Sequence, residues 1–507
     1  MRDDTLETRI EVDSLGKINV PKEAYYGAFT VRAKQTFQIS GRLAHPQYIK
    51  YLAILKRACA VANKKLGTLD GRIAKAIIQA ADEIINSIGN KKEYGQIKIS
   101  EYGKFEELFP LDVFQAGAGT PFNMNMNEVL ANIAIKKLGG KQGDYNLAHP
   151  NNHVNMSQSS NDVTPTAIRL TALYLFKSLE QELDALSHAF AKKAREYKDV
   201  VKVGMTHLED AVPITFGQVF YSYAHSLDDA ARRISAAKES LLELGIGGTA
   251  IGTGITTHPD FKKTVVDELS KETGFKLKVG ADSIQLTWSM AAFAYFSSAL
   301  KTLALDINKI CNDLRLMNSG PQTGFAQIVL PEVEPGSSIM PGKINPSVAE
   351  CMNQICYQVF GNDTAITHAA DNGQLELNVM TPVIGYNLFF SIDILAAGMK
   401  MLRTDCVDGI KVNEERCAYL LDRNPIIATA LNPYLGYEVV AELVKEALRE
   451  DKPIREIVLK YNLIQADILN KLLDPKKLTQ PSVVDAKLAN EIKASNAYKK
   501  FKVIIGK

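Results

Sequence analysis

With 507 residues, the chain is too long for one compact core, and we expect two or three domains. Apolar residues make up 46% and charged residues 23%, which is ordinary for a soluble globular protein. The net charge of +2 leaves no basic excess that would indicate a nucleic-acid partner.

The first third of the chain begins with a short non-helical segment and continues as helices. Residues 1–25 alternate short apolar stretches with Gly16 and Pro21, which predicts a small irregular or β cap. From about 48 to 90 the apolar pattern is helical. Residues 91–106 are polar and interrupted by glycine, so we expect an exposed insertion. A Gly/Asn-rich segment at 116–128 then precedes a helix from Glu128 to about Leu138.

The middle of the chain carries two long apolar seams. Their residues recur at steps of three and four: Phe176, Leu179, Leu183, Leu186 and Phe190, then Phe220, Tyr223, Leu227, Ala230, Ile234, Ala237, Leu241 and Leu244. Such seams predict long helices that pack at shallow angles. With further apolar runs at 289–317, 348–360 and 383–400, they predict a helical bundle.

The end of the chain has the pattern of a smaller domain. A helix is expected at about 438–449, among turns marked by Pro425, Pro433 and Pro453. The lysines at the C-terminal end indicate a solvated tail.

Cysteine usage and the N-terminus both favour the cytoplasm. The six cysteines form no Cys-x-x-Cys pair, which suits reduced, buried thiols. The segment Met1–Thr5 lacks the apolar run of a signal peptide. The most apolar segments, near 289–307 and 383–399, are interrupted by charged residues, so we expect buried helices and not bilayer spans. We therefore expect a cytoplasmic protein without a membrane partner.

The loop Gly336–Pro346 is the most informative segment of the chain. It places two serines, a lysine and an asparagine between glycines and prolines. Glycine lets the backbone close over a small ligand, and proline fixes the entry and exit of the loop. Lys343 and Asn345 offer a cation and a directional donor to a carboxylate. A hydroxyl held beside that cation can be activated for proton transfer or nucleophilic attack. A solvated turn would explain the glycines and prolines but not this concentration of polar groups.

Three other polar clusters interrupt the helical pattern, and each has a functional and a structural interpretation. In Gly117–Thr120 the threonine can present its hydroxyl and backbone N–H to an anion, or the segment only begins a helix. Asn155–Asp162 offers neutral donors to a polar ligand, or Asp162 or Thr164 caps a helix that has Pro165 at its first position. Gly204–His207 puts a histidine in a turn between two long helices, where it is catalytic or structural.

Two other signals carry little weight. His149 and His153 stand at i, i+4 without a Cys or carboxylate partner beside them, so no metal site is predicted. The Gly-rich stretch 245–254 lacks both the dinucleotide spacing and a Gly-Lys-Ser/Thr ending, and we expect it to reverse the chain between helices.

Together these residues resemble the fumarase/aspartase superfamily. The signature of that family is the Gly-Ser-Ser-x-Met-Pro-x-Lys-x-Asn-Pro found at 336–346, and the likeness extends from Tyr25-Tyr26-Gly27 through Leu431-Asn432-Pro433. The resemblance implies an all-α protomer of three domains, which we place at 1–157, 158–411 and 412–507. It also implies a homotetramer built on the central helices, with each active site drawn from three subunits.

The resemblance further implies the chemistry. Members of the family cleave a C–N or C–O bond of a succinyl-type substrate and release fumarate or a fumaryl group. The proton removed lies beside a carboxylate, so its loss builds a doubly charged aci-carboxylate that fixed donors must stabilise. Ser337 would be the general base on a mobile loop, and Glu350 would orient His207. No redox cofactor is required, and a divalent cation acts as an activator in some relatives.

The substrate-binding residues follow from the same resemblance. Lys343 and Asn345 would hold one carboxylate. The carboxylate that becomes the aci-form would contact four hydroxyls, those of Thr120, Ser159, Ser160 and Ser338. Asn161, Thr206 and His207 would surround the leaving group and the remaining carboxylate.

Within the family, the chain is most similar to the aspartase branch, which deaminates L-aspartate reversibly to fumarate and ammonia. Tyr25-Tyr26-Gly27 and the stretch Asn372–Met380 favour that branch, whereas Ser159-Ser160-Asn161-Asp162 has the form usual in fumarases. Hydration of fumarate to L-malate is therefore the alternative. Argininosuccinate and adenylosuccinate lyases fit the Asn-rich segment at 123–127 less well. An inactive structural or binding protein on the same fold is the remaining hypothesis, although such a protein would be free to lose Ser337 or Lys343, and both are present.

Overall fold

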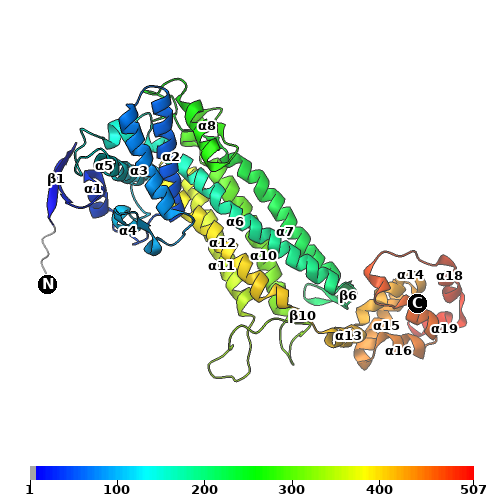
Figure 1. Ribbon diagram of the computed structural model, residues 1–507. Coiled ribbons are helices and arrows are strands. Elements are labelled where there is room, and N and C mark those ends of the chain that lie inside the picture. Colours follow the sequence, from blue (N-terminus) through cyan, green and yellow to red (C-terminus); the bar gives the residue numbers. More distant parts are fainter. Residues whose placement is uncertain (1–6, 507) are drawn as a thin grey trace. The chain divides into compact units, whose positions relative to one another are not determined.

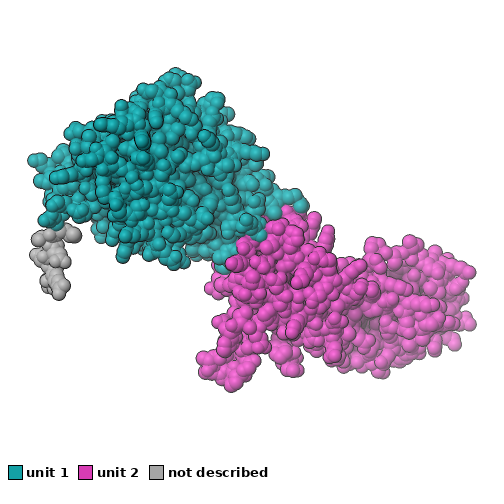
Figure 2. Space-filling view, in the orientation of Figure 1, with its two compact units in different colours: residues 1–181, 230–305, 355–397 teal, residues 182–229, 306–354, 398–507 magenta. Residues whose placement is uncertain are grey.

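The computed structural model describes residues 7–506, and it is mostly helical, as the sequence predicts (Figure 1). The chain divides into two compact units (Figure 2). Unit 1 combines residues 1–181, 230–305 and 355–397, and unit 2 combines residues 182–229, 306–354 and 398–507. The three domain boundaries expected from the sequence stay a prediction.

The first part of unit 1 starts with a β-hairpin and continues as helices. Strands β1 (Thr8–Asp13) and β2 (Gly16–Pro21) pair antiparallel, so the predicted β cap is confirmed for the described residues. The predicted helical region at 48–90 is also confirmed. The helices here are α1 (Ala28–Thr36), α2 (Pro46–Lys65), α3 (Gly71–Ile88) and α5 (Thr120–Lys137). Helix α2 packs against α3 and against α8 (Phe261–Thr273), which places it in the core of unit 1.

Five long helices run alongside one another (Figure 1). They are α6 (Ser160–Glu196), α7 (Phe216–Lys238), α10 (Ala291–Met317), α11 (Ser347–Asp371) and α12 (Thr381–Asp405). Within unit 1, Phe176 of α6 packs edge-on against Phe296 of α10. Within unit 2, Phe190 of α6 packs against Tyr223 of α7. All predicted seam residues are buried, which confirms both seams and the helical bundle.

Short elements connect these helices. A β-hairpin between α6 and α7 consists of β5 (Val201–Thr206) and β6 (Glu209–Thr215). The other short elements are β3 (Lys98–Ile99), β4 (Gly103–Lys104), α4 (Phe105–Leu108), β7 (Glu243–Leu244), β8 (Lys278–Val279), α9 (Ser283–Trp288), β9 (Ile328–Val329) and β10 (Lys411–Val412). Among residues 7–506, strands pair only in twos, and β7 with β8 is the parallel pair.

The C-terminal part of unit 2 is a cluster of short helices around its own apolar core. These are α13 (Glu414–Arg423), α14 (Asn432–Leu435), α15 (Tyr437–Glu450), α16 (Ile454–Lys460), α17 (Ala466–Leu472), α18 (Ala486–Ala494) and α19 (Asn496–Ile504). Leu443 of α15 and Phe501 of α19 are among the buried residues of this core. The helix expected at 438–449 is therefore confirmed. Lys499 and Lys500 are exposed, as expected, but they lie in helix α19, which the buried Phe501 anchors, and not in a tail. Lys507 lies outside the described residues.

Other local expectations need correction. Helix α5 begins at Thr120, eight residues before the predicted start, because Pro121 fits its first turn and buried asparagines continue it. The insertion at 91–106 is only partly exposed: its β3–β4 hairpin buries Ile97, Ile99 and Tyr102. Among the cysteines, Cys351 is exposed and the other five are buried.

One described segment, Thr381–Gly409, has the length and composition of a membrane span. In its most apolar window 61% of the residues are buried, and Ile384, Leu388 and Ile392 are completely so. This burial agrees with the helix inside protein that the sequence predicts for 383–399.

Candidate active site

In unit 1 the structure brings two of the predicted clusters together. Thr120 begins α5, and Ser160 begins α6. Asn123, one turn after Thr120, donates from Nδ2 to Ser160 Oγ over 2.9 Å. A side chain at Gly119 would meet Thr164 of α6 at 2.8 Å, so the glycine allows the close approach of the two helix starts. Two helix N-termini with their N–H groups and hydroxyls thus lie side by side, an arrangement suited to a carboxylate.

The start of α6 differs from the sequence expectation. Ser159 Oγ accepts from Asn161 N at 3.3 Å, while Ser159 N donates to Asp162 Oδ1 at 2.9 Å. This reciprocal pair makes Ser159 the capping residue. The predicted cap at Asp162 or Thr164 is therefore wrong, and Pro165 lies inside the helix. The consequence is that Ser159, Ser160 and Asn161 all stand at the positive end of the helix.

A buried lysine that the sequence did not single out donates hydrogen bonds to the segment just before α6. Lys56 of α2 is completely buried, and its Nζ donates to Asn155 Oδ1 at 2.9 Å and to Gln158 Oε1 at 2.8 Å. Asn155 Oδ1 also accepts from Asn123 and Asn127. Burial lowers the pKa of Lys56 to about 7, against the attraction of Cys59 and Asp162. The network joins both clusters through buried side chains.

The Gly-rich stretch 245–254 does more than reverse the chain. Asp162 Oδ2 accepts from Gly247 N at 3.0 Å and from Thr249 N at 2.8 Å, and Asn161 Nδ2 donates to Ala250 O at 2.7 Å. Burial raises the pKa of Asp162 to about 6, although these N–H groups and Lys56 favour its ionised form. Asp162 therefore ties the Gly-rich stretch to the start of α6.

In unit 2, Thr206 and His207 lie at the tip of the β5–β6 hairpin. His207 and Leu208 have φ values of 57° and 63°, so the two-residue turn is of the type that has both central residues in the left-handed region. Thr206 and His207 are exposed. The expected turn between two long helices is confirmed, and it presents the imidazole to solvent in the isolated chain.

The loop 336–346, also in unit 2, forms an open segment between β9 and α11 (Figure 1). Ser337 Oγ accepts from Ile339 N at 3.2 Å and from Met340 N at 3.1 Å. Lys343 Nζ donates to Asn345 Oδ1 at 2.7 Å, and Asn345 Nδ2 donates to Gly336 O at 2.8 Å. These bonds hold Ser337, Lys343 and Asn345 in one small loop, whereas Ile339 at its tip is 83% exposed.

Glu350 follows this loop in the first turn of α11. Within the chain its ion-pair partner is Arg315, with 3.9 Å between Nη2 and Oε1, and both side chains are 40% exposed. An exposed pair of this length contributes little to stability. The carboxylate is therefore available to other groups, and its pairing with His207 stays a prediction.

The two discounted histidines have backbone partners. His149 Nδ1 accepts from Asn151 N at 3.0 Å, and His153 Nδ1 accepts from His149 N at 2.9 Å. Among residues 7–506, no group of three or more His, Cys, Asp or Glu side chains could hold a metal ion.

The predicted site residues fall into two sets. Thr120, Ser159, Ser160 and Asn161 belong to unit 1, and the structure gathers them around two helix starts. Unit 2 holds the second set, which consists of Thr206, His207, Ser337, Ser338, Lys343, Asn345 and Glu350. The first set offers uncharged donors for an anion, and the second offers a hydroxyl, a cation and an imidazole, the groups needed to move a proton.

Two protein-family models together match most of the chain. A family model described as Lyase matches residues 16–361, and one described as Fumarase C C-terminus matches residues 427–480. Among curated proteins, the chain is 42% identical to the aspartate ammonia-lyase of Bacillus sp, over 95% of this chain and 99% of that protein. It is 45% identical to the aspartate ammonia-lyase of Pseudomonas aeruginosa, over 94% of this chain and 98% of that protein.

Solved structures give the same result for the fold. A fumarate lyase:delta crystallin from Brucella melitensis bound to cobalt has a TM-score of 0.87 and 42% identity, over 94% of this chain and all of that one. A class II fumarase from Schistosoma mansoni has the same TM-score and 33% identity, again over 94% of this chain and all of the other.

Proposed function

The chain belongs to the fumarase/aspartase family of lyases, and from this premise we propose that it deaminates L-aspartate reversibly to fumarate and ammonia. The observation that carries the proposal is identity of 42–45% to aspartate ammonia-lyases over nearly the whole length of both chains. The class II fumarase of Schistosoma mansoni is less similar, at 33% identity. Hydration of fumarate is therefore the second candidate, favoured by the Ser160 that fumarases usually carry at this position.

Ser337 is proposed as the base that removes the proton beside the substrate carboxylate. Its Oγ accepts two backbone N–H groups, and such donors stabilise negative charge on the oxygen once its own proton is lost. Lys343 lies in the same loop and adds a positive charge, which also attracts the dicarboxylate. When the loop closes over the substrate, Lys343 Nζ would exchange its bond to Asn345 Oδ1, and Asn345 Nδ2 its bond to Gly336 O, for bonds to a carboxylate.

The hydroxyls of Thr120, Ser159, Ser160 and Ser338 are proposed to bind the carboxylate that becomes the aci-form. Two helix starts supply donors whose positions are already set by Asp162 and Asn123, so little reorganisation is needed as charge builds up. Asn161, Thr206 and His207 are proposed to surround the leaving amine and the remaining carboxylate, with His207 oriented by Glu350.

A homotetramer is proposed to complete the site. Ser160 is the first residue of α6, a helix of 37 residues that is about 55 Å long at 1.5 Å per residue. Thr206 and His207 follow the other end of this helix in the β5–β6 hairpin. In the tetramer, the N-terminal end of α6 in one copy would lie beside the C-terminal end of α6 in a partner, next to that partner's β5–β6 hairpin. The exposed Ile339 and Met340 of the loop would then have a neighbour to contact.

The reaction needs no cofactor in this proposal, because proton transfer and charge stabilisation suffice. The cobalt named for the Brucella melitensis structure belongs to that protein. Activation by a divalent cation, a cytoplasmic location and the three domain boundaries remain predictions for this chain.

The experiment is a pair of assays and one variant. Fumarate formation, followed by absorbance, is measured with L-aspartate or L-malate as the sole substrate, and aspartate should be turned over much faster. If malate is turned over as fast as aspartate or faster, the chain is a fumarase and not an aspartate ammonia-lyase. If neither substrate is turned over, the result favours an inactive protein on this fold. Ser337→Ala should abolish turnover with the tetramer intact, whereas Glu334→Gln, at an exposed position just before the loop, should retain it. Activity kept by Ser337→Ala would remove Ser337 from the role of base.

A further inference from the structure

Asn372-Gly373 is the only Asn-Gly pair in the sequence, and it lies just after α11 in unit 1. The helix ends at Asp371, so neither residue of the pair is held in regular helical geometry. Both residues are exposed. The pair is not among the residues proposed for the lyase reaction. Its chemistry is therefore a separate question from that of the proposed active site.

An exposed Asn-Gly pair can react with itself, because the glycine nitrogen can attack the side-chain carbonyl carbon of the asparagine. The attack closes a five-membered ring, and a glycine has no Cβ to crowd it. Two Asn-Ser pairs in the chain are less suited to this reaction. Asn86-Ser87 lies inside α3, where the helix fixes the backbone. Asn318-Ser319 is half-buried, and Asn318 Oδ1 accepts from Leu330 N at 3.0 Å.

The side-chain amide of Asn372 makes a contact that this reaction would remove. Its Nδ2 donates to His368 O at 2.6 Å and so satisfies one carbonyl of the last turn of α11. If the amide became a carboxylate, an acceptor would face that carbonyl in place of a donor. The carboxylate would also stand at the negative end of the helix, where a negative charge is unfavourable. The end of α11 would therefore loosen.

The segment after the pair is tied to the start of α5, where Thr120 lies. Asn378 is completely buried, and its Nδ2 donates to Ala369 O at 3.0 Å and to Ala370 O at 3.1 Å. The next residue, Val379, accepts at its carbonyl from Ala118 N at 2.6 Å. A change in the length of the backbone at Asn372 would therefore act on the bond that holds Ala118.

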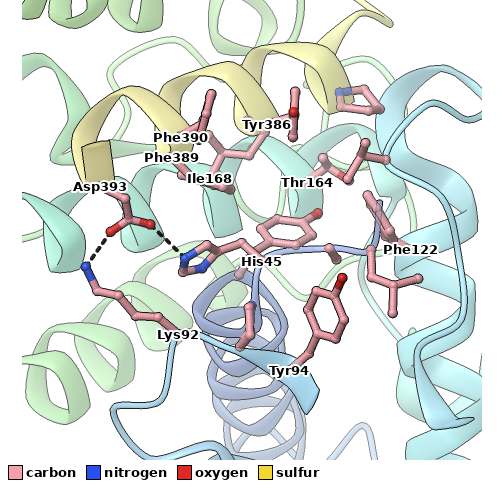
Figure 3. A pocket seen from close by; sticks show the side chains of 17 residues that line it. His45, Lys92, Tyr94, Phe122, Thr164, Ile168, Tyr386, Phe389, Phe390 and Asp393 are labelled. Carbon is pink, nitrogen blue, oxygen red and sulfur yellow. Dashed lines mark hydrogen bonds and ion pairs between the residues drawn. The ribbon is translucent and has the colours of Figure 1, made fainter. Parts of the chain in front are cut away.

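The far end of the same segment leads into α12, which is fixed by contacts of its own. Asp393 of α12 forms an ion pair with Lys92, and its Oδ2 lies 3.0 Å from His45 Nε2 (Figure 3). Phe389 of α12 packs against Tyr48 with ring centroids 5.9 Å apart. Because α12 is anchored in this way, an added backbone atom would displace the segment and not the helix.

We propose that the chain modifies itself at Asn372 to isoaspartate and that the longer backbone loosens the start of α5. The nitrogen of Gly373 loses its proton and bonds to Asn372 Cγ, the bond from Cγ to Nδ2 breaks, and ammonia leaves with that proton. Water then opens the cyclic imide. Opening at the backbone carbonyl gives isoaspartate, in which the chain runs through Cγ, and opening at Cγ gives aspartate. Water is the only co-reactant, and nothing is oxidised or reduced.

The test is peptide mapping by mass spectrometry after the whole protein has been incubated in mildly alkaline oxygen-18 water. Isoaspartate that carries the label should accumulate at Asn372, about tenfold more than at Asn86 or Asn318. Gly373→Ala should slow the reaction about tenfold, which corresponds to a barrier raised by about 1.4 kcal/mol. Gly361→Ala, in α11 at a position where a Cβ meets no other atom, should leave the rate unchanged. If Gly373→Ala fails to fold, the comparison among the three asparagines of the wild type still decides.

Hydrogen exchange tests the effect on α5. The isoaspartate form, separated by its added negative charge, should exchange the amide of Ala118 about threefold faster than the unmodified protein. Freshly prepared Asn372→Asp has the same charge and a backbone of normal length, so exchange at Ala118 should stay unchanged.

Three results would each overturn the proposal. They are the absence of modification at Asn372, aspartate there without isoaspartate, and equal modification of Asn86 and Asn318. Exchange at Ala118 that is the same in the isoaspartate form and the unmodified protein would overturn its second part. None of these readouts depends on lyase activity.

Discussion

Replacing Lys56 by methionine removes an amine from the centre of the buried network while keeping its apolar stem. In the folded chain Nζ donates to two acceptors, Asn155 Oδ1 and Gln158 Oε1. A neutral amine has two N–H groups, so the observed contacts suit the unprotonated form that burial favours. Methionine would leave Gln158 Oε1 without this donor, at a cost of about 1–3 kcal/mol in the free energy of unfolding.

This cost should depend on pH in a direction that the structure fixes. The pKa of Lys56 is about 7 in the folded chain and has its usual value of 10.5 in the unfolded chain. Between these values the unfolded chain binds more protons, so stability rises with pH across the window. From pH 6 to pH 8.5 this linkage amounts to about 2 kcal/mol. The wild type should gain that advantage over Lys56→Met, because the variant has no amine to titrate.

Urea unfolding at fixed protein concentration and ionic strength, at pH 6 and at pH 8.5, measures the difference. The gap in unfolding free energy between wild type and Lys56→Met should widen by about 2 kcal/mol at the higher pH. Lys64→Met, on the exposed side of the same helix, should show the same gap at both pH values. A gap for Lys56→Met that does not change with pH would refute the burial of an amine with a lowered pKa.

Three further substitutions test other parts of unit 1. Glu128→Ala leaves three N–H groups at the start of α1 without their acceptor, so the urea midpoint should fall by the equivalent of about 3 kcal/mol, and an unchanged midpoint would exclude this capping role. Gly252→Ala should lower the free energy of unfolding by about 3 kcal/mol or more, because its φ is +92° and a Cβ would lie 2.4 Å from a backbone atom. Gly254→Ala should lower it by only about 1 kcal/mol. Equal losses in the two variants would contradict this account of crowding at Gly252. Asp162→Asn should raise the KM for aspartate at least tenfold with kcat less affected, because one amide cannot accept at both of its terminal atoms.

Much of the fold could be predicted because it depends on local periodicity. Leu183 and Leu227 repeat at helical spacing with their neighbours, and both are buried in the long helices that this pattern predicts. The start of α5 could not be predicted in the same way. Asparagine has a low helix propensity, yet Asn125 lies buried in the helix because its amide donates to Leu108 O at 2.9 Å. Tertiary contacts outweighed the local preference.

The candidate site likewise combines residues that the sequence identifies with residues that only the folded chain reveals. The loop at 336–346 is recognisable because its chemical groups are adjacent in sequence. Lys56 is not, because it stands in an ordinary helical pattern and its partner Asn155 lies 99 residues away. The pairing of Asp162 with the Gly-rich stretch is equally remote from any local signal, as 85 residues separate it from Gly247. Residues that position others are found only when the chain is folded.

The role proposed for His207 would limit how heat-resistant this protein can become without losing its reaction, because His207 and Leu208 both have positive φ angles. Asparagine and glycine are the residues that tolerate both positive φ angles, and each ordinary residue in that region costs about 1 kcal/mol. Substitutions that raise thermal stability alone would therefore remove the imidazole, which the role proposed for His207 requires. At His207 of this hairpin, thermal stability and the proposed catalytic role make opposite demands, whereas Leu208 carries only the cost in stability.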